Sequence, residues 1–182
     1  MPEWGSTAVG REEPRRYGRW AAARVVSIGL WSEPIAALSP RSYEAVLTGL
    51  EHLRKARAFS VAVLDRFPGA MPFRMLVEAE TRHVEALAAL LRRRGLAVPP
   101  DRHLGSERTR RAVPATAICA CRIAADAAEA SARLFETELA ARVAGLTDVE
   151  GVMRRLGEAL AARHLPALRH WADHHRGRGG TA

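Results

Sequence analysis

Residues 77–95 read VEAETRHVEALAALLRRRG and place polar residues where an amphipathic helix should present apolar ones. The apolar stripe of this segment runs through Leu76 and Leu87. A helical repeat of about 3.6 residues puts Glu80 and His83 on the same stripe. We therefore expect a carboxylate and an imidazole to point together into the core of the protein.

The composition favours a single all-α domain with a positive charge. The chain has 182 residues, of which 48% are hydrophobic, and this is enough for one domain of ordinary size with a core. Ala, Leu, Arg and Glu dominate, while β-branched and aromatic residues are scarce, so helix is favoured nearly throughout. The formal charge of +8 comes almost wholly from arginine and predicts attraction to anions without naming one.

Neither the cysteines nor the apolar runs indicate a secreted or membrane protein. Cys119 and Cys121 lie two apart in a helical pattern, which points their side chains to nearly opposite sides and argues against a mutual disulfide. The N-terminal run RRYGRWAAARVVSIGLW differs from a signal peptide because Arg24 interrupts it and Glu12 and Glu13 precede it. No apolar run is long enough to span a bilayer, so we expect a cytoplasmic protein.

Capping and turn signals predict four long helices. Ser39 followed by Pro40 predicts the start of a helix that runs to about residue 66. Further helices are predicted over 71–95, over 114–145 and over 147–175, the last opening with the capping box TDVE. The predicted organisation is an arm with a short helix at 20–31 (1–38), a four-helix bundle (39–175) and a flexible tail (176–182).

The lengths of the predicted links determine the topology. Short links join the first helix to the second and the third to the fourth, so each pair should form an antiparallel hairpin. A helix of about 23 residues spans roughly 35 Å, and an extended link of about 18 residues reaches roughly 60 Å. The middle link can therefore return along the whole bundle, which gives the ferritin-like arrangement of two hairpins and one long crossover.

Three segments carry a resemblance to bacterial ferritin-like proteins. They are LVEAETRHVEAL in the second helix, ICACRIAAD in the third and RHLPALRHW in the fourth, and the likeness extends over residues 50–96 and 117–171. The resemblance implies a ferritin-like four-helix bundle that binds metal through inward carboxylates and histidines. It implies the ligand set Glu80, His83, Asp126 and His164.

The resemblance is incomplete at two ligand positions. Leu53 stands where the first helix of the family brings a glutamate, with Glu51 and His52 beside it as additional candidate ligands. Ala161 stands three residues before His164, where the family has a carboxylate. The chain therefore keeps about four of six ligands, which indicates one metal ion or an incomplete di-metal site.

The third helix leaves two interpretations open. Arg122, Asp126 and Glu129 share one helix face, which is either solvated and held by ion pairs one turn apart or turned inward. In the inward case Glu129 is a further candidate ligand. Alternatively, Arg122 then occupies the place of a metal ion and neutralises Asp126 and Glu80, so that a buried salt-bridge network replaces the metal site.

Two classes of function follow from these patterns. In the first, the site binds iron, with manganese or zinc as other options, and the protein is an iron-dependent oxidoreductase or a metal-handling protein. In the second, the bundle is metal-free and acts as a binding or assembly protein. We expect a homo-oligomer or an anionic partner held by arginine patches, and neither a membrane nor a nucleic acid as partner. Stacking on single strands has no support because aromatic residues do not alternate with the arginines.

Overall fold

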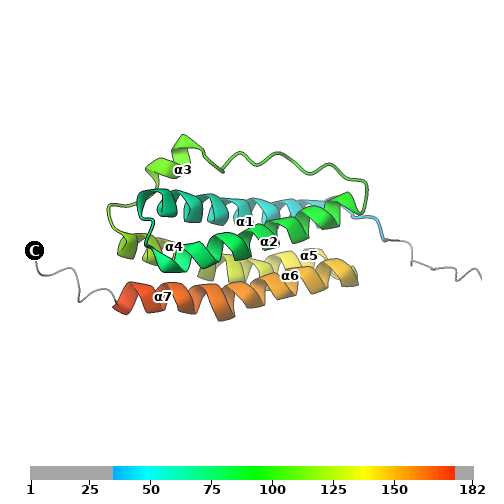
Figure 1. Cartoon of the computed structure of the whole chain (residues 1–182). Coiled ribbons are helices and arrows are strands. Elements are labelled where there is room, and N and C mark those ends of the chain that lie inside the picture. The colour runs from blue at the N-terminus through cyan, green and yellow to red at the C-terminus, as the bar shows by residue number, and fades with distance from the viewer. Residues whose placement is uncertain (1–34, 175–182) are drawn as a thin grey trace, which may run out of the picture. The chain divides into compact units, whose positions relative to one another are not determined.

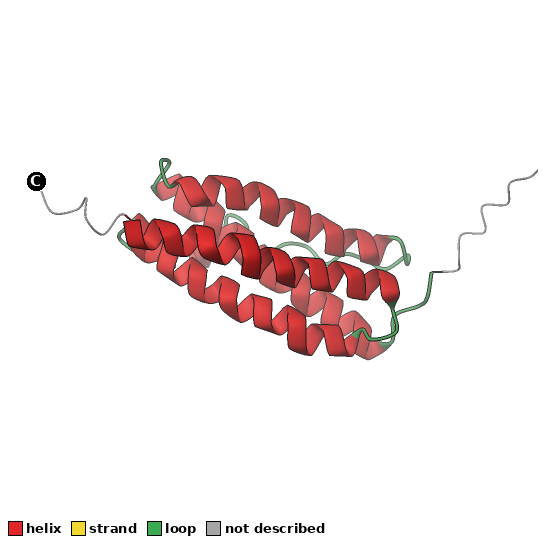
Figure 2. Cartoon of the chain, turned by 90° about the horizontal axis from the view of Figure 1, so that it is seen from below, coloured by secondary structure: helices red, strands yellow, loops and turns green. Residues whose placement is uncertain are grey.

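The computed structural model describes residues 35–174, and this part of the chain consists of helices and their links without a strand (Figures 1 and 2). Helix α1 spans Pro40–Arg66 and begins as predicted, because the side chain of Ser39 accepts a hydrogen bond from the backbone N–H of Ser42 at 3.1 Å. The short helix predicted at 20–31 lies outside the described residues.

The remaining elements form three further long helical stretches. Helix α2 spans Met71–Arg92. The third stretch is α4 (Ala117–Arg133), the π-helical turn η1 (Leu134–Leu139) and α5 (Ala140–Arg142), which follow one another without a break. The fourth is α6 (Thr147–Ala159), the π-helical turn η2 (Leu160–His164) and α7 (Leu165–His174). The all-α prediction is thereby confirmed for residues 35–174.

Local details differ from the sequence prediction at three helix starts. The link between α2 and α4, predicted as a loop, contains the short helix α3 (Glu107–Arg111). Helix α4 starts later than predicted, because the Thr116 hydroxyl and not Pro114 caps it by accepting the N–H of Cys119. At α6 the predicted capping box does not form, because Leu146 is the N-cap and Thr147 lies inside the helix, while Glu150 accepts the N–H of Gly145 at 2.7 Å.

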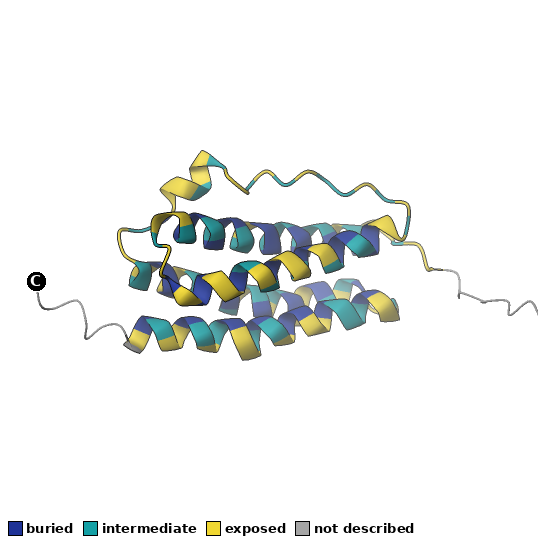
Figure 3. Ribbon diagram, viewed as in Figure 1, coloured by how far each residue is buried: buried dark blue, intermediate teal, exposed yellow. Residues whose placement is uncertain are grey.

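The long stretches pack as two antiparallel pairs. Helix α1 contacts α2, and α4 with η1 contacts α6, η2 and α7. Because the link after α2 runs back along α1 and carries α3 with it, α4 begins near the end of the bundle where α2 also begins (Figure 1). Buried residues line the inner faces of the helices, as Figure 3 shows.

The core consists of two apolar clusters at different levels of the bundle. One cluster includes Leu50, Leu87 and Phe135, and the other includes Phe73 and Leu168. On α2 the first cluster begins at residue 84 and the second ends at residue 76, so the helix passes from one to the other around residue 80. Buried Ser60, Glu80 and His164 lie at the level between the two clusters.

Candidate functional site

Four polar residues form a layer between the two apolar clusters, and we call this set the polar layer. Its members are Ser60 of α1, Glu80 and His83 of α2, and His164 at the end of η2. Ser60, Glu80 and His164 are buried, and His83 is half-buried. The prediction that Glu80 points into the core is therefore confirmed, with a second histidine contributed by another helix.

Glu80 is a buried carboxyl group with little compensation. It is 4% exposed, and its Oε2 has no hydrogen-bond partner among residues 35–174. Burial raises the pKa of Glu80 to about 8, because an apolar environment disfavours the charged form, while a hydrogen bond with Ser60 and the charge of Arg57 oppose this shift. Near neutral pH the protonated, uncharged form of Glu80 therefore dominates.

The two histidines of the polar layer stack on one another. The ring centroids of His83 and His164 are 5.2 Å apart and the ring planes are inclined by 20°. Burial lowers the pKa of His164 to about 4 and also lowers the pKa of His83, and nearby arginine charges act in the same direction. Both imidazoles are thus uncharged at neutral pH, and each offers one donor and one acceptor nitrogen.

His164 lies in a π-helical turn. The η2 segment, Leu160–His164, interrupts the α-helical hydrogen bonding of the fourth stretch at the level of the polar layer. π-Helical turns inside α-helices occur frequently at functional sites. The sequence did not indicate this turn, because its residues are compatible with an ordinary α-helix.

A cavity of about 670 Å³ adjoins the polar layer between α1 and α4. Glu80 and His164 form part of its wall, and Phe59, Leu76 and Leu168 supply much of its apolar lining. The volume lies within the range of about 300–1,000 Å³ that is typical of small-molecule pockets. Such pockets are mostly apolar and contain a few polar groups that orient the ligand.

Small side chains on α4 create the space for this cavity. Ala124, Ala127, Ala128 and Ser131 line it from the α4 side, where larger residues would fill the gap to α1. The alanine-rich composition of α4 therefore acts as a structural determinant of the cavity.

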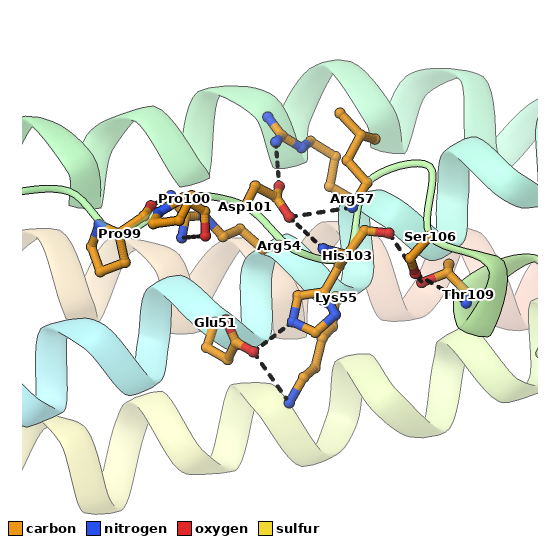
Figure 4. Close-up of polar contacts among 11 residues, drawn as sticks. Glu51, Arg54, Lys55, Arg57, Pro99, Pro100, Asp101, His103, Ser106 and Thr109 are labelled. Atoms are coloured by element: carbon orange, nitrogen blue, oxygen red, sulfur yellow. Dashed lines mark hydrogen bonds and ion pairs between the residues drawn. The ribbon is translucent and has the colours of Figure 1, made fainter.

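The link between α2 and α4 contributes residues such as His103 and Thr109 to the wall of the cavity, and we call its residues 96–116 the covering segment. Arg54 is 6% exposed and donates hydrogen bonds to the carbonyl oxygens of Pro99, at 2.6 Å, and Pro100, at 3.4 Å (Figure 4). Arg57 pairs with Asp101 at 2.7 Å (Figure 4). These contacts attach the covering segment to α1.

Asp101 organises the next turn of the covering segment. Its Oδ1 accepts the backbone N–H of His103 at 2.8 Å and that of Leu104 at 3.2 Å. The ring of His103 in turn contacts the carboxylate of Glu51 (Figure 4). Two hydrogen bonds from these backbone groups and one from Arg57 lower the pKa of Asp101, although burial acts in the opposite direction and is the largest single effect.

The predicted metal ligands are only partly brought together. Glu80, His83 and His164 lie in the polar layer, whereas Asp126 is exposed on α4 and does not line the cavity. The inward positions of α4 around Asp126 are occupied by Ala125 and Ala128.

The additional candidate ligands have other partners. Glu51 pairs with His103 and Lys55, and His52 faces Ser131 at 3.5 Å. Glu129 pairs with Arg169 at 2.8 Å.

The alternative salt-bridge network on α4 is wrong for this structure. Arg122 and Asp126 are both exposed, so their helix face is solvated and does not turn inward. Two arginines of α1, Arg54 and Arg57, reach inward and bind the covering segment. Sequence reasoning missed this role because α1 arginines at that spacing also fit a solvated helix face.

The ligand set of a di-metal centre does not fit the described residues. Within residues 35–174, no group of three or more His, Cys, Asp or Glu side chains is placed to hold a metal ion. Leu53 is buried at the position where the predicted ligand set would need a glutamate, and no carboxylate of the described part of α4 enters the site. The remaining chemistry of the site is hydrogen bonding by uncharged groups beside an apolar cavity.

Comparison of the chain with models of protein families, with curated proteins and with solved structures found no match. In the part that the structure describes, every helix is too short or too polar to span a bilayer. The argument for function therefore rests on the geometry of the polar layer and the cavity.

Proposed function

We propose that the protein binds a small, largely apolar molecule in the cavity between α1 and α4. The observation that carries this proposal is the cavity of about 670 Å³, whose wall combines an apolar surface with the buried Glu80 and His164. A site of this size and composition is the common form of a small-molecule pocket. In this proposal the protein is a binding module and the polar layer orients the ligand.

The fold that we propose for this function is a ferritin-like four-helix bundle that has lost its metal centre. Two antiparallel pairs joined by one long link support the ferritin-like arrangement. Leu53 and Ala161 stand where the resemblance requires metal-binding carboxylates, and Ala125 and Ala128 occupy inward positions of α4 in place of Asp126. The space left by these small residues becomes the ligand cavity. The predicted homo-oligomer and the anionic partner stay predictions.

Binding of a fluorescent apolar probe tests the proposal. N-phenyl-1-naphthylamine is uncharged and fluoresces in apolar surroundings, so we expect saturable binding of one molecule per chain. The variant Ala124→Phe places a ring in the cavity and should weaken binding about tenfold or more through steric overlap. The control Ala141→Phe adds the same ring to an exposed position of α5 outside the cavity and should bind like the wild type.

Two results would contradict this function. One is the absence of saturable probe binding to the folded wild-type protein. The other is equal binding to the wild type and to Ala124→Phe, which would place the probe elsewhere on the surface. Circular dichroism of both variants checks that the helices are retained.

A second candidate function is the binding of a single divalent metal ion by the polar layer. It is favoured by one observation: Glu80 Oε2 and His83 Nδ1 are buried without a hydrogen-bond partner in the described part of the chain. Carboxylate and imidazole groups together suit iron, manganese or zinc. This candidate requires His83 and His164 to leave their stacked arrangement, because stacked rings do not direct their nitrogens toward one point.

Metal titration decides between the two candidates. Anaerobic incubation with ferrous iron, followed by desalting and elemental analysis, should leave no stoichiometric metal if the cavity is an organic ligand site. About one iron per chain, lost in the double variant Glu80→Ala with His83→Ala, would instead support the metal-binding candidate and an oxygen-linked redox function.

A further inference from the structure

The cavity extends along the helices that enclose it. Its lining residues fall within 51–59 on α1, within 123–131 on α4 and within 160–168 on the fourth helical stretch. Because a helix rises about 1.5 Å per residue, each of these spans is about 12 Å long. The cavity therefore has room for an extended alkyl chain that lies parallel to the helices.

Most residues of the cavity wall are apolar. Phe59 of α1, Leu76 of α2 and Leu168 of α7 belong to the second apolar cluster or pack against it. The α4 side of the wall consists mainly of alanines and Ile123. Transfer of methylene groups from water to such surroundings is favourable and needs no directional partner. An unbranched alkyl chain is therefore a suitable occupant.

The rim of the cavity, by which we mean its exposed lining residues, is positively charged. Its charged members are Lys55 of α1 and Arg108 of α3. Glu107, the carboxylate next to Arg108 in sequence, binds Arg110 at 3.1 Å and Arg111 at 2.9 Å. Arg108 itself forms no ion pair within residues 35–174. Its guanidinium group is therefore available to a ligand.

The carboxylate closest to this rim already has partners. Glu51 lines the cavity and is half-buried, and it binds the ring of His103 and lies 3.8 Å from Lys55 Nζ (Figure 4). A cationic ligand group at Glu51 would have to displace one of these contacts. An exposed pair one turn apart contributes little, so Lys55 remains able to attract a second carboxylate. The rim thus favours a negatively charged ligand group.

We propose that the cavity binds an alkyl carboxylate, with the chain along the apolar wall and the carboxylate at the rim beside Arg108. A guanidinium group binds a carboxylate through two parallel hydrogen bonds, which orient the ligand as well as attract it. At the rim both charges keep part of their hydration, so the cost of burying an ion pair is avoided. This inference rests on the proposed function of the cavity and adds the class of ligand.

Three compounds with the same alkyl chain test the inference: decanoate, decanol and decylamine. Their affinities are measured by displacement of N-phenyl-1-naphthylamine at pH 7, at concentrations below micelle formation. We expect decanoate to bind about fivefold more tightly than decanol, the upper end of what an exposed ion pair contributes, and decylamine to bind most weakly. About 1 M salt should remove most of this preference, because it shortens the Debye length to about 3 Å.

Three variants assign the preference to Arg108. Arg108→Gln should lower the preference for decanoate over decanol to about twofold or less, and Arg108→Glu should make decylamine bind more tightly than decanoate. The control Arg122→Gln removes the same charge from an exposed position of α4 outside the cavity and should keep the wild-type preference. Unchanged affinity for decanol shows that the cavity is intact in each variant.

The outcomes separate this inference from the proposed function. If decanoate and decanol bind equally to the wild type, the cavity binds ligands but the inference is overturned. It is also overturned if decylamine binds most tightly, or if Arg108→Gln and Arg122→Gln lower the preference equally, because the net charge of the protein then explains it. If neither N-phenyl-1-naphthylamine nor any of the three compounds binds, the proposed function itself fails.

Discussion

Glu80 and His164 titrate in opposite directions on folding, and this gives the polar layer a pH signature. Folding raises the pKa of Glu80 from 4.5 to about 8, so the folded state holds this proton more tightly than the unfolded state. Folding lowers the pKa of His164 from 6.5 to about 4, so the folded state holds that proton less tightly. Each shift makes the free energy of unfolding depend on pH.

The Glu80 contribution to stability is full below pH 4.5 and is lost as the pH rises through about 8. We therefore predict that the free energy of unfolding falls as the pH approaches about 8, well above the ordinary His164 pKa of 6.5, where the opposing His164 contribution is nearly complete. Glu80→Gln cannot ionise and should flatten this fall. Urea unfolding at several pH values measures it, and parallel curves for wild type and variant would contradict the prediction.

The His164 contribution has the opposite sign. It is full above pH 6.5 and is lost as the pH falls through about 4, because the unfolded state takes up the proton first. His164→Phe keeps an aromatic ring and removes the titrating group, so its stability should decline less steeply with acidification than that of the wild type. Equal steepness of the acid-induced decline in wild type and variant would contradict this prediction.

At the scale of the elements, a few polar contacts attach the covering segment to α1. Buried Arg54 supplies hydrogen bonds to the carbonyl oxygens of Pro99 and Pro100, and hydrogen bonds to charged groups contribute about 1.5–3 kcal/mol. Arg54→Ala should therefore loosen residues 96–116 while the long helices stay folded. We expect faster trypsin cleavage after Arg102 and faster release of N-phenyl-1-naphthylamine.

A matched control for this prediction is Arg74→Ala on α2. Arg74 is exposed, and its substitution removes the same charge without touching the covering segment. Cleavage and probe release should match the wild type in this control. Equal cleavage of Arg54→Ala and wild type would show that the contacts of Arg54 do not hold the segment.

The elements show which features a single sequence can predict. The start of α1 and the inward position of Glu80 were predicted because a cap and a helical repeat are local signals. Whether Asp126 is exposed or inward was left open, because nothing local decides which face of an alanine-rich helix turns inward. The roles of Arg54 and Asp101 were missed because they depend on two segments that meet only in the folded chain.

At the scale of the whole molecule, the two apolar clusters and the layer between them have separate tasks. The clusters bury large side chains and supply the stability of the bundle. The polar layer and the cavity interrupt this packing and remove contacts that a continuous core would have. Such an interruption is destabilising, so its position beside small α4 residues supports a role in ligand binding.

Substitution of Phe135 tests whether the stability of the bundle and ligand binding depend on different residues. Its ring is fully buried in η1, and a Cβ atom added at Gly49 would lie 3.1 Å from it, so α1 and η1 approach closely at this point. Phe135→Ala should lower the free energy of unfolding by about 3–5 kcal/mol, the usual loss for a buried ring. Thr137→Ala, an exposed change in the same turn, should alter it by about 0.5 kcal/mol or less.

The same variant should leave ligand binding unchanged, because Phe135 does not line the cavity. Under conditions where Phe135→Ala is still folded, its affinity for N-phenyl-1-naphthylamine should equal that of the wild type. Ala124→Phe should instead bind the probe weakly while its fold stays stable. A loss of affinity in folded Phe135→Ala would mean that the clusters and the cavity respond as one unit. Retained affinity would establish that the cavity is a separable site within a bundle stabilised elsewhere.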